Sequence, residues 1–271
     1  GKVMENNELY TLLELPEEVI YKLNIYSKNR KNTFKIDFND LMKNNEIIQK
    51  LDQLIKDEVG QDIDGIKTLY EQLNIARQSF EEYQRKGIPI SIFIDTMKFC
   101  TRFLIEYYNT YTCYRFVWGW WFPRQLCLKE FRIGALEYEY CEGKYINIHI
   151  PSDANLSKQS VLKSLSEFKD FCNKYYPEWI KQKIQCESWL LSPALKDILN
   201  NPSNILEFQK LFDIIEIDYE SMAVLDWVFP GFHGVSEKLP EKTSLQRNMK
   251  KYLLEGKKIG WAKGILQKDY R

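Results

Sequence analysis

The clearest strand signal in the chain is an alternation of apolar and polar residues near its midpoint. Leu136, Tyr138 and Tyr140 fall on one face of the predicted strand, and Glu137 and Glu139 fall on the other. Successive side chains of a strand point to opposite faces, so this period of two predicts a half-buried strand. We expect the two glutamates to be solvated, as most strand glutamates are, although each is also a candidate base.

A tight turn and a return strand follow. The turn is predicted at Cys141–Lys144, where Gly143 is free to take a positive φ. The return strand again separates two sets of side chains, with Ile146, Ile148 and Ile150 on one face and Tyr145, Asn147 and His149 on the other. Pro151 has no N–H to donate, and it therefore ends the strand. The pattern predicts an antiparallel pair with one face in the core.

Short polar side chains connect this pair to a helix. They are Ser152, Asp153, Asn155 and Ser157. Ser157 suits the N-cap of the helix beyond it. A helix N-terminus presents unpaired N–H groups and the positive end of the helix dipole, so the pattern predicts an anion-binding pocket here, with His149 at its wall. Asp153 argues against this prediction, because a fixed negative charge repels a phosphate.

Helical spacing dominates the first half of the chain, and no strand pattern precedes residue 131. The spacing predicts helices that begin at Leu15–Glu18, span Asn45–Val59, run from Asp64 to Gly87 and run from Pro89 to Leu104, with a loop at Lys31–Lys35. The last of these helices is apolar nearly all round, which is typical of a helix buried by its neighbours. Asp95 and Arg102 within it either find local partners or line a polar pocket between the two halves of the chain.

Further strands and helices alternate in the second half. Strands are predicted at Ile184–Leu191, Ile205–Ile217 and Val224–Phe229, with a short helix over Ser192–Leu199 between the first two. Trp189 and Trp227 have bulky apolar neighbours in these strands, so we expect both in the core. We expect a mixed sheet of about six strands that includes these segments and the strands around the turn.

A last helix begins with the sequence of a capping box, Thr243–Gln246. Arg247 lies in its first turn, where the helix dipole disfavours a cation. Two interpretations remain open for this arginine. It is either solvated or paired with an anion outside the helix.

Composition narrows the class of protein. Lys plus Arg equal Asp plus Glu at 38 each, so the chain has no net charge, whereas nonspecific nucleic-acid binding needs a basic surface. The most apolar window, Cys113–Phe122, is too short to span a bilayer, and Glu5 and Glu8 interrupt any signal peptide. We expect a cytoplasmic protein with no nucleic-acid or membrane partner, whose six cysteines are reduced thiols.

The chain lacks the motifs of several common enzyme classes. It contains no Gly-x-Ser-x-Gly elbow, Walker A sequence or dinucleotide fingerprint. It has no Cys-x-x-Cys pair and two histidines, which argues against a metal site. His149 is a candidate general base, because histidine suits proton transfer near neutral pH. The alternative is a structural histidine bonded to a backbone carbonyl.

The order of elements from Phe131 onward is strand, strand, polar loop, helix, strand, helix, strand, strand, which matches the acyl-CoA-binding core of the GNAT superfamily. More specifically, the chain resembles a bacterial family of acyltransferase-like proteins, which join a helical N-acyltransferase N-terminal domain to a GNAT-like C-terminal domain. The segments that carry the resemblance are Phe131–Gly134, His149–Asp153, Ser188–Leu191, Ser203–Ile205, Phe208–Gln209 and Thr243–Arg247, with a weaker likeness at Asp95–Met97 and in the Trp-rich run.

The resemblance implies an α+β fold. Residues 1–130 would form a helical N-terminal domain, packed on a GNAT-like mixed β-sheet with flanking helices formed by residues 131–271. It also implies an acyltransferase that moves an acyl group from an acyl-CoA-like co-substrate to an amine or hydroxyl of a small-molecule acceptor, with no covalently bound cofactor. The candidate catalytic residues are His149 and Glu139, and the candidate donor-binding residues are Ser152, Asn155, Ser157 and Arg247.

The chain departs from ordinary GNAT enzymes at the phosphate loop. That loop usually reads Arg/Gln-x-x-Gly-x-Gly/Ala, so that successive backbone N–H groups can surround the pyrophosphate. The corresponding segment here, Pro151–Ser157, contains no glycine. The rival hypothesis is therefore a noncatalytic ligand-binding or interaction protein that retains the fold.

Overall fold

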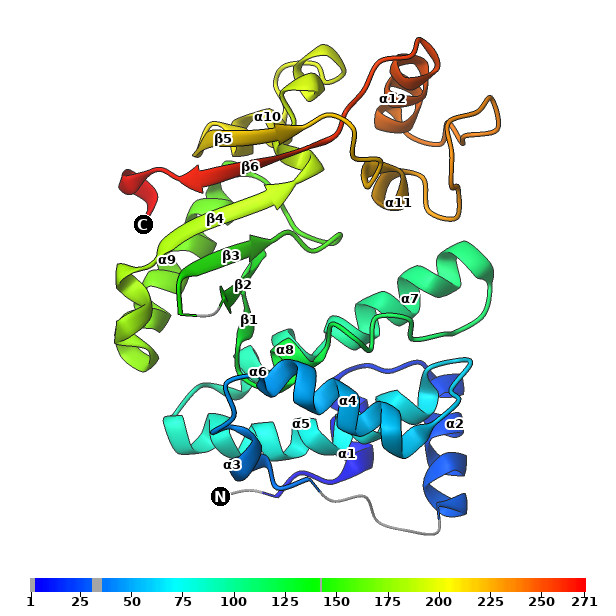
Figure 1. Ribbon diagram of the computed structural model, residues 1–271, viewed down its shortest axis with the longest axis vertical. Coiled ribbons are helices and arrows are strands. Elements are labelled where there is room, and N and C mark those ends of the chain that lie inside the picture. The colour runs from blue at the N-terminus through cyan, green and yellow to red at the C-terminus, as the bar shows by residue number, and fades with distance from the viewer. Residues whose placement is uncertain (1–2, 31–35, 142) are drawn as a thin grey trace. The chain divides into compact units, whose positions relative to one another are not determined.

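The computed structural model of the protein describes residues 3–30, 36–141 and 143–271 (Figure 1). Its backbone divides into two units, residues 1–132 and 133–271, with the boundary inside strand β1. The loop predicted at Lys31–Lys35 lies outside the described residues. So does Glu142 in the predicted turn, although Gly143 does have a positive φ of 69°. None of the described helices is both long and apolar enough to cross a membrane.

The first unit is helical, as predicted, and no described residue before β1 lies in a strand. Its helices are α1 (Asn6–Leu12), α2 (Glu17–Asn29), α3 (Phe38–Leu41), α4 (Ile47–Val59), α5 (Ile66–Lys86), α6 (Ile90–Met97), α7 (Phe99–Tyr111) and α8 (Pro123–Leu126). The long helix α5 packs against α1, α2, α4, α6 and α8. Its predicted apolar stripe, from Ile66 to Tyr83, is buried, so the helical spacing identified the central helix of this unit.

The prediction of a single helix from Pro89 to Leu104 is wrong in one respect. The structure ends α6 at Met97 and begins α7 at Phe99, so two helices share this apolar run. Arg102 has local partners, since its guanidinium carbon lies 5.1 Å from the centre of the Phe103 ring.

The second unit is built on a mixed sheet, which confirms the predicted α+β fold. The described strands are β1 (Glu130–Ile133), β2 (Leu136–Cys141), β3 (Tyr145–His149), β4 (Lys183–Ser188), β5 (Phe212–Asp218) and β6 (Trp261–Leu266). They form one sheet in the order β1-β2-β3-β4-β6-β5. The β2–β3, β4–β6 and β5–β6 pairs are antiparallel, and β3 pairs with β4 in parallel.

Helices flank this sheet. They are α9 (Lys158–Tyr175), α10 (Asn204–Gln209), α11 (Val224–Val228) and α12 (Ser244–Leu254), with short 3-10 turns η1 (Pro177–Lys181), η2 (Trp189–Leu191), η3 (Pro193–Asp197) and η4 (Lys268–Tyr270). A parallel pair needs a crossover connection, and α9 provides it between β3 and β4. The ring of Phe168 in α9 stacks on Tyr138 at 3.9 Å, which places α9 on the Tyr138 face of the sheet.

Two predicted strands are corrected. Val224–Phe229 is helical over α11, because Val224, Leu225, Val228 and Phe229 are buried at the spacing of a helix face. The alternation read from Leu225, Trp227 and Phe229 was therefore misleading, as short apolar runs often are. The segment Ile205–Ile217 is divided into α10, capped by Ser203, and the strand β5.

The predictions for the two tryptophans are also corrected. Trp227 is 45% exposed on α11 and does not belong to the core. Trp189 follows the end of β4, in η2, and is a partly buried residue packed against the apolar cluster of Leu195, Val224 and Phe229. Neither lies in a strand.

A buried ion pair lies inside the first unit. The carboxylate of Glu71 is 3.1 Å from Arg30 Nε, and Arg30 Nη2 is 3.1 Å from Glu58 Oε1. Burial raises the pKa of Glu71 to about 7, because the loss of hydration outweighs the attraction of Arg30, which lowers this pKa. The negative charge of Glu58 has a smaller effect and also raises the pKa. The folded state thus binds this proton more tightly than the unfolded state does.

We expect the contribution of Glu71 to the free energy of unfolding of the wild type to fall as the pH rises from about 4.5 through about 7, because Glu71 must ionise in a buried position. In Glu71→Gln this contribution is absent, so stability relative to the wild type should increase over that pH range. Urea denaturation at several pH values measures the difference. Glu58→Gln is the control and should retain most of the Glu71 contribution, because Glu58 adds only the smaller effect. A relative stability that falls as the pH rises would contradict the prediction.

A second prediction concerns Gly264 in β6. A Cβ atom at this position would lie 2.8 Å from Phe212 Cβ and 3.2 Å from Leu191 Cδ1. We expect Gly264→Ala to lower the free energy of unfolding by about 1–3 kcal/mol in urea denaturation, because an overpacked core must shift. Gly234→Ala, where a Cβ would meet nothing within 4 Å, is the matched control. Equal stability of the two variants would refute the argument.

Candidate active site

The strands β3 and β4 pair along part of their length and then separate. Their parallel register runs from Tyr145↔Lys183 to Ile148↔Cys186. Beyond this point β4 continues beside β6, with Glu187 opposite Lys263, while β3 ends at His149. The pairing between the carboxyl ends of these neighbouring strands therefore stops there (Figure 1), and we call this break in the pairing the opening of the sheet. Such openings in sheets that contain parallel strands are common ligand sites.

The two faces of the sheet differ in polarity at this opening. Tyr138, Ile146 and Ile148 lie on the face covered by α9 and are buried. The register pairs Glu137 with His149 and Glu139 with Asn147, which places these four polar side chains together on the opposite face. The period of two in both strands thus gives one apolar face and one face suited to chemistry.

Glu139 and His149 are in direct contact. The distance from His149 Nε2 to Glu139 Oε1 is 2.8 Å. The Glu139 side chain is 12% exposed and that of His149 is 27% exposed, so the pair is largely shielded from solvent. When Nε2 carries a proton it donates to the carboxylate, which leaves the lone pair of the ring on Nδ1. A carboxylate that orients an imidazole in this way prepares it to accept a proton.

The expectation that the strand glutamates are solvated is wrong. Counted over the whole residue, Glu137 is 2% exposed and Glu139 is 9% exposed. Period-two alternation assigns a side chain to a face of the sheet, but it cannot show whether that face is covered. Buried carboxylates are costly unless they are hydrogen-bonded, and His149 provides a hydrogen bond for Glu139.

The loop after β3 leads into the N-terminus of α9. Asn155 Oδ1 accepts a hydrogen bond from Ser157 N at 2.9 Å, and Ser157 Oγ accepts one from Ser160 N at 3.3 Å, which confirms Ser157 as the N-cap. Both side-chain oxygens are therefore engaged locally. Val161 N donates to Ser157 O, so the N–H groups of Lys158 and Gln159 in the first turn of α9 precede the hydrogen-bonded part of the helix.

The remaining predicted site residues lie in different settings. Ser152 and Asp153 are exposed in the loop that follows Pro151. Arg247 is exposed on α12, and its Nη1 donates to the carbonyl oxygen of Glu241 at 3.3 Å. The structure brings His149 and Glu139 into contact, whereas Arg247 finds its hydrogen-bond partner in the segment just before its own helix.

Family models match nearly the whole chain. The model of the N-acyltransferase N-terminal domain matches residues 4–128, and that of the GNAT-like C-terminal domain matches residues 130–266. The chain belongs to the GNAT-like acyltransferase family. This confirms the resemblance read from the sequence, and with it the prediction of a GNAT-like acyltransferase. No curated protein matches the chain.

Solved structures of acyltransferases share the fold of this GNAT-like chain. One, in complex with decanoyl-CoA and teicoplanin, has a TM-score of 0.76 at 18% identity, covering 98% of this chain and 89% of that one. A second, with CoA and 10C-teicoplanin, has a TM-score of 0.77 at 18% identity, covering 97% and 87%. A third, with decanoyl-CoA, has a TM-score of 0.75 at 20% identity, covering 98% and 89%.

Sequence reasoning gave little weight to several groups at the opening of this GNAT-like sheet. Asn147 shares a face with His149, and its Oδ1 is buried with no hydrogen-bond partner in the described part of the chain. The backbone N–H groups of Lys158 and Gln159 follow the Ser157 cap. The signals were present in the sequence, since Asn147 is two residues from His149 in one strand and the two N–H groups follow directly from the cap position.

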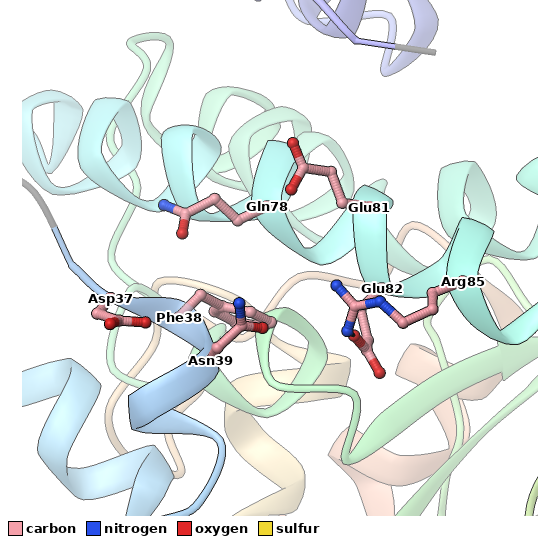
Figure 2. Close-up of a pocket in the computed structure, with 7 residues that line it drawn as sticks. All are labelled: Asp37, Phe38, Asn39, Gln78, Glu81, Glu82 and Arg85. Atoms are coloured by element: carbon pink, nitrogen blue, oxygen red, sulfur yellow. Dashed lines mark hydrogen bonds and ion pairs between the residues drawn. The ribbon is translucent and has the colours of Figure 1, made fainter. Parts of the chain in front are cut away.

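A small pocket elsewhere lies within the first unit (Figure 2). It has a volume of about 110 Å³ and is lined by residues 37–39 and by Gln78, Glu81, Glu82 and Arg85 of α5. Asp37 caps α3 through the N–H of Asp40, and Arg85 pairs with Glu82. These polar groups are engaged locally, and none of the residues is among those that the sequence indicates as functional.

A third prediction tests the N-terminus of α9. We expect Ser157→Ala to lower the free energy of unfolding by about 1 kcal/mol, because Ser160 N loses its acceptor. Ser157→Asp restores an acceptor and should recover most of the loss. Guanidinium denaturation measures both variants. Ser166→Ala, at an exposed position of the same helix, is the control, and an equal loss in that variant would show that the cap is not responsible.

Proposed function

We propose that the chain transfers an acyl group from acyl-CoA to an amine or hydroxyl acceptor where β3 and β4 separate. The observation that carries the proposal is the 2.8 Å contact between Glu139 and His149 at this opening. The fold supports it, because acyltransferases solved with decanoyl-CoA or CoA share it over 97–98% of this chain. An oriented base and an acyl-CoA fold together fit acyl transfer better than ligand binding alone.

His149 serves as the general base in this mechanism. The nucleophilic atom of the acceptor attacks the thioester carbonyl, and His149 Nδ1 accepts a proton from it, directly or through a water molecule. The new C–N or C–O bond forms, the C–S bond breaks, and the thiolate of CoA receives the proton that His149 holds. Glu139 stabilises the imidazolium that exists between these steps, because its carboxylate lies next to Nε2.

Backbone N–H groups hold the anionic part of the donor. The loop contains no glycine, so the phosphates would interact with the segment Ser152–Ser157 and with the N–H groups of Lys158 and Gln159. The oxygens of Asn155 and Ser157 shape this turn rather than contact the donor, since both accept hydrogen bonds from nearby backbone groups. Arg247 would contribute only if it exchanged its present partner, the carbonyl of Glu241.

The partners are therefore a small-molecule acyl donor and a small-molecule acceptor. Acyltransferases of this fold have been solved with decanoyl-CoA and with teicoplanin, which motivates medium-chain acyl-CoA as the first donor to test. The rival, a noncatalytic binding protein, is favoured by the absence of glycine between Pro151 and Ser157. The two proposals differ in whether the thiol of CoA is released when an acceptor is added.

A fourth prediction tests the base. We expect His149→Ala to lower kcat by about 10²–10⁴-fold with little change in the KM for acyl-CoA, because the base acts on the acceptor and not on the donor. Glu139→Gln should lower kcat less, since His149 remains. The readout is release of CoA thiol with decanoyl-CoA. His233→Ala, which alters the exposed second histidine of the chain, is the matched control.

Thermal shifts with CoA, acetyl-CoA and decanoyl-CoA separate the two proposed functions, because a ligand that binds the folded state raises the melting temperature. Binding without thiol release in the wild type would favour the noncatalytic protein. Wild-type turnover in His149→Ala would remove His149 from the mechanism. If no acyl-CoA raises the melting temperature, the proposed donor is wrong.

A further inference from the structure

Glu187 of β4 lies level with His149 of β3 across the opening of the sheet. The parallel register ends with Asn147 opposite Gln185 and Ile148 opposite Cys186, so the next residues on the two strands are His149 and Glu187. Because side chains alternate along each strand, these two lie on the same polar face as Asn147 and Gln185. A carboxylate thus borders the opening on the side opposite the proposed base.

The carboxylate of Glu187 is held on one side and open on the other. Gln185 Nε2 donates to Glu187 Oε1 at 3.2 Å, and Lys263 Nζ lies 3.8 Å from the same oxygen. In the described part of the chain no group pairs with Oε2, and the side chain is 43% exposed. Two neighbours therefore orient the carboxylate and leave one oxygen for a ligand.

The polar face around the opening offers mainly hydrogen-bond acceptors. Glu139 and Glu187 are carboxylates, and Asn147 Oδ1 is buried with no hydrogen-bond partner among the residues that the structure describes. A buried acceptor without a donor is unfavourable, so these oxygens suit a ligand rich in N–H groups. A protonated amino group has three N–H donors and a positive charge, which matches two carboxylates.

We propose that Glu187 is a specificity-determining residue that binds the protonated amino group of a cationic acceptor and places it opposite His149. This inference rests on the proposed acyl transfer. Glu187 makes its contact while the acceptor is still an ammonium ion. The ammonium ion then loses one proton to solvent, and the neutral amine attacks the thioester while His149 accepts the second proton, which passes to the departing thiolate of CoA. Lys263 opposes this role, because its positive charge lies 3.8 Å from the same carboxylate. The contact with Glu187 favours charged amines, while His149 acts on any nucleophile.

The test compares two acceptors with decanoyl-CoA at pH 7.5. Ethanolamine is largely an ammonium ion at this pH, whereas hydroxylamine is largely neutral. We expect Glu187→Gln to raise the KM for ethanolamine about fivefold, the effect of one partly exposed charge contact. Its kcat for ethanolamine and its KM for hydroxylamine should stay within twofold of the wild type. Lys263→Gln should lower the KM for ethanolamine and leave that for hydroxylamine unchanged.

Glu207→Gln is the matched control, because Glu207 of α10 lies in the same unit, is 42% exposed and pairs with Lys210, which follows that helix. It should change neither KM, and equal melting temperatures show that all variants are folded. A KM that rises equally for both acceptors, or does not rise at all, overturns the role of Glu187. A loss of kcat with hydroxylamine would identify Glu187 as a base instead. A wild type that transfers to neither acceptor overturns the proposed function as well, whereas normal wild-type transfer limits the failure to Glu187.

Discussion

The parallel pairing of β3 with β4, and its end at Ile148 and Cys186, is the constraint on which the second unit depends. A parallel pair needs a crossover, and α9 supplies it after a polar loop capped by Ser157. In this connection the N-terminus of α9 follows the carboxyl end of β3 along the chain. Where the pairing stops, β4 remains paired with β6 and keeps its position, so the opening is bordered by two ordered strands. The candidate site and the crossover helix therefore both result from the connection between β3 and β4.

One strand serves both the core and the candidate site. In β3 the isoleucines pack toward α9, while Asn147 and His149 occupy the opposite face. Core packing therefore fixes where the polar side chains point, because a slip of one residue would expose the isoleucines and bury the histidine in the apolar core. The burial of Glu137 and Glu139 on the polar face makes this face unlike an ordinary solvated surface. Buried carboxylates are retained at functional sites more readily than in structural cores.

Several features were predictable because they follow from local rules. The apolar stripe of α5, the cap at Ser157 and the alternation in β2 and β3 all depend on residues close in sequence. The errors came from segments in which both periods fit. Val224–Phe229 is apolar at spacings of two and of four, and only its packing against Leu195 and Met249 makes it a helix. Trp227 was assigned to the core for the same reason, since an apolar side chain indicates burial but does not select a face.

The sequence by itself determined that His149 and Glu139 lie on the polar faces of two neighbouring strands, that Ser157 caps a helix, and that the chain resembles GNAT-like acyltransferases. Only the tertiary structure decided that the two side chains touch at 2.8 Å, and that Glu187 stands level with His149 across the opening. The physical reason is register. Periodicity assigns side chains to faces, but hydrogen bonding between strands distant in sequence sets which residues lie opposite one another. Residues 139, 149 and 187 come from three strands, and no local pattern encodes their alignment.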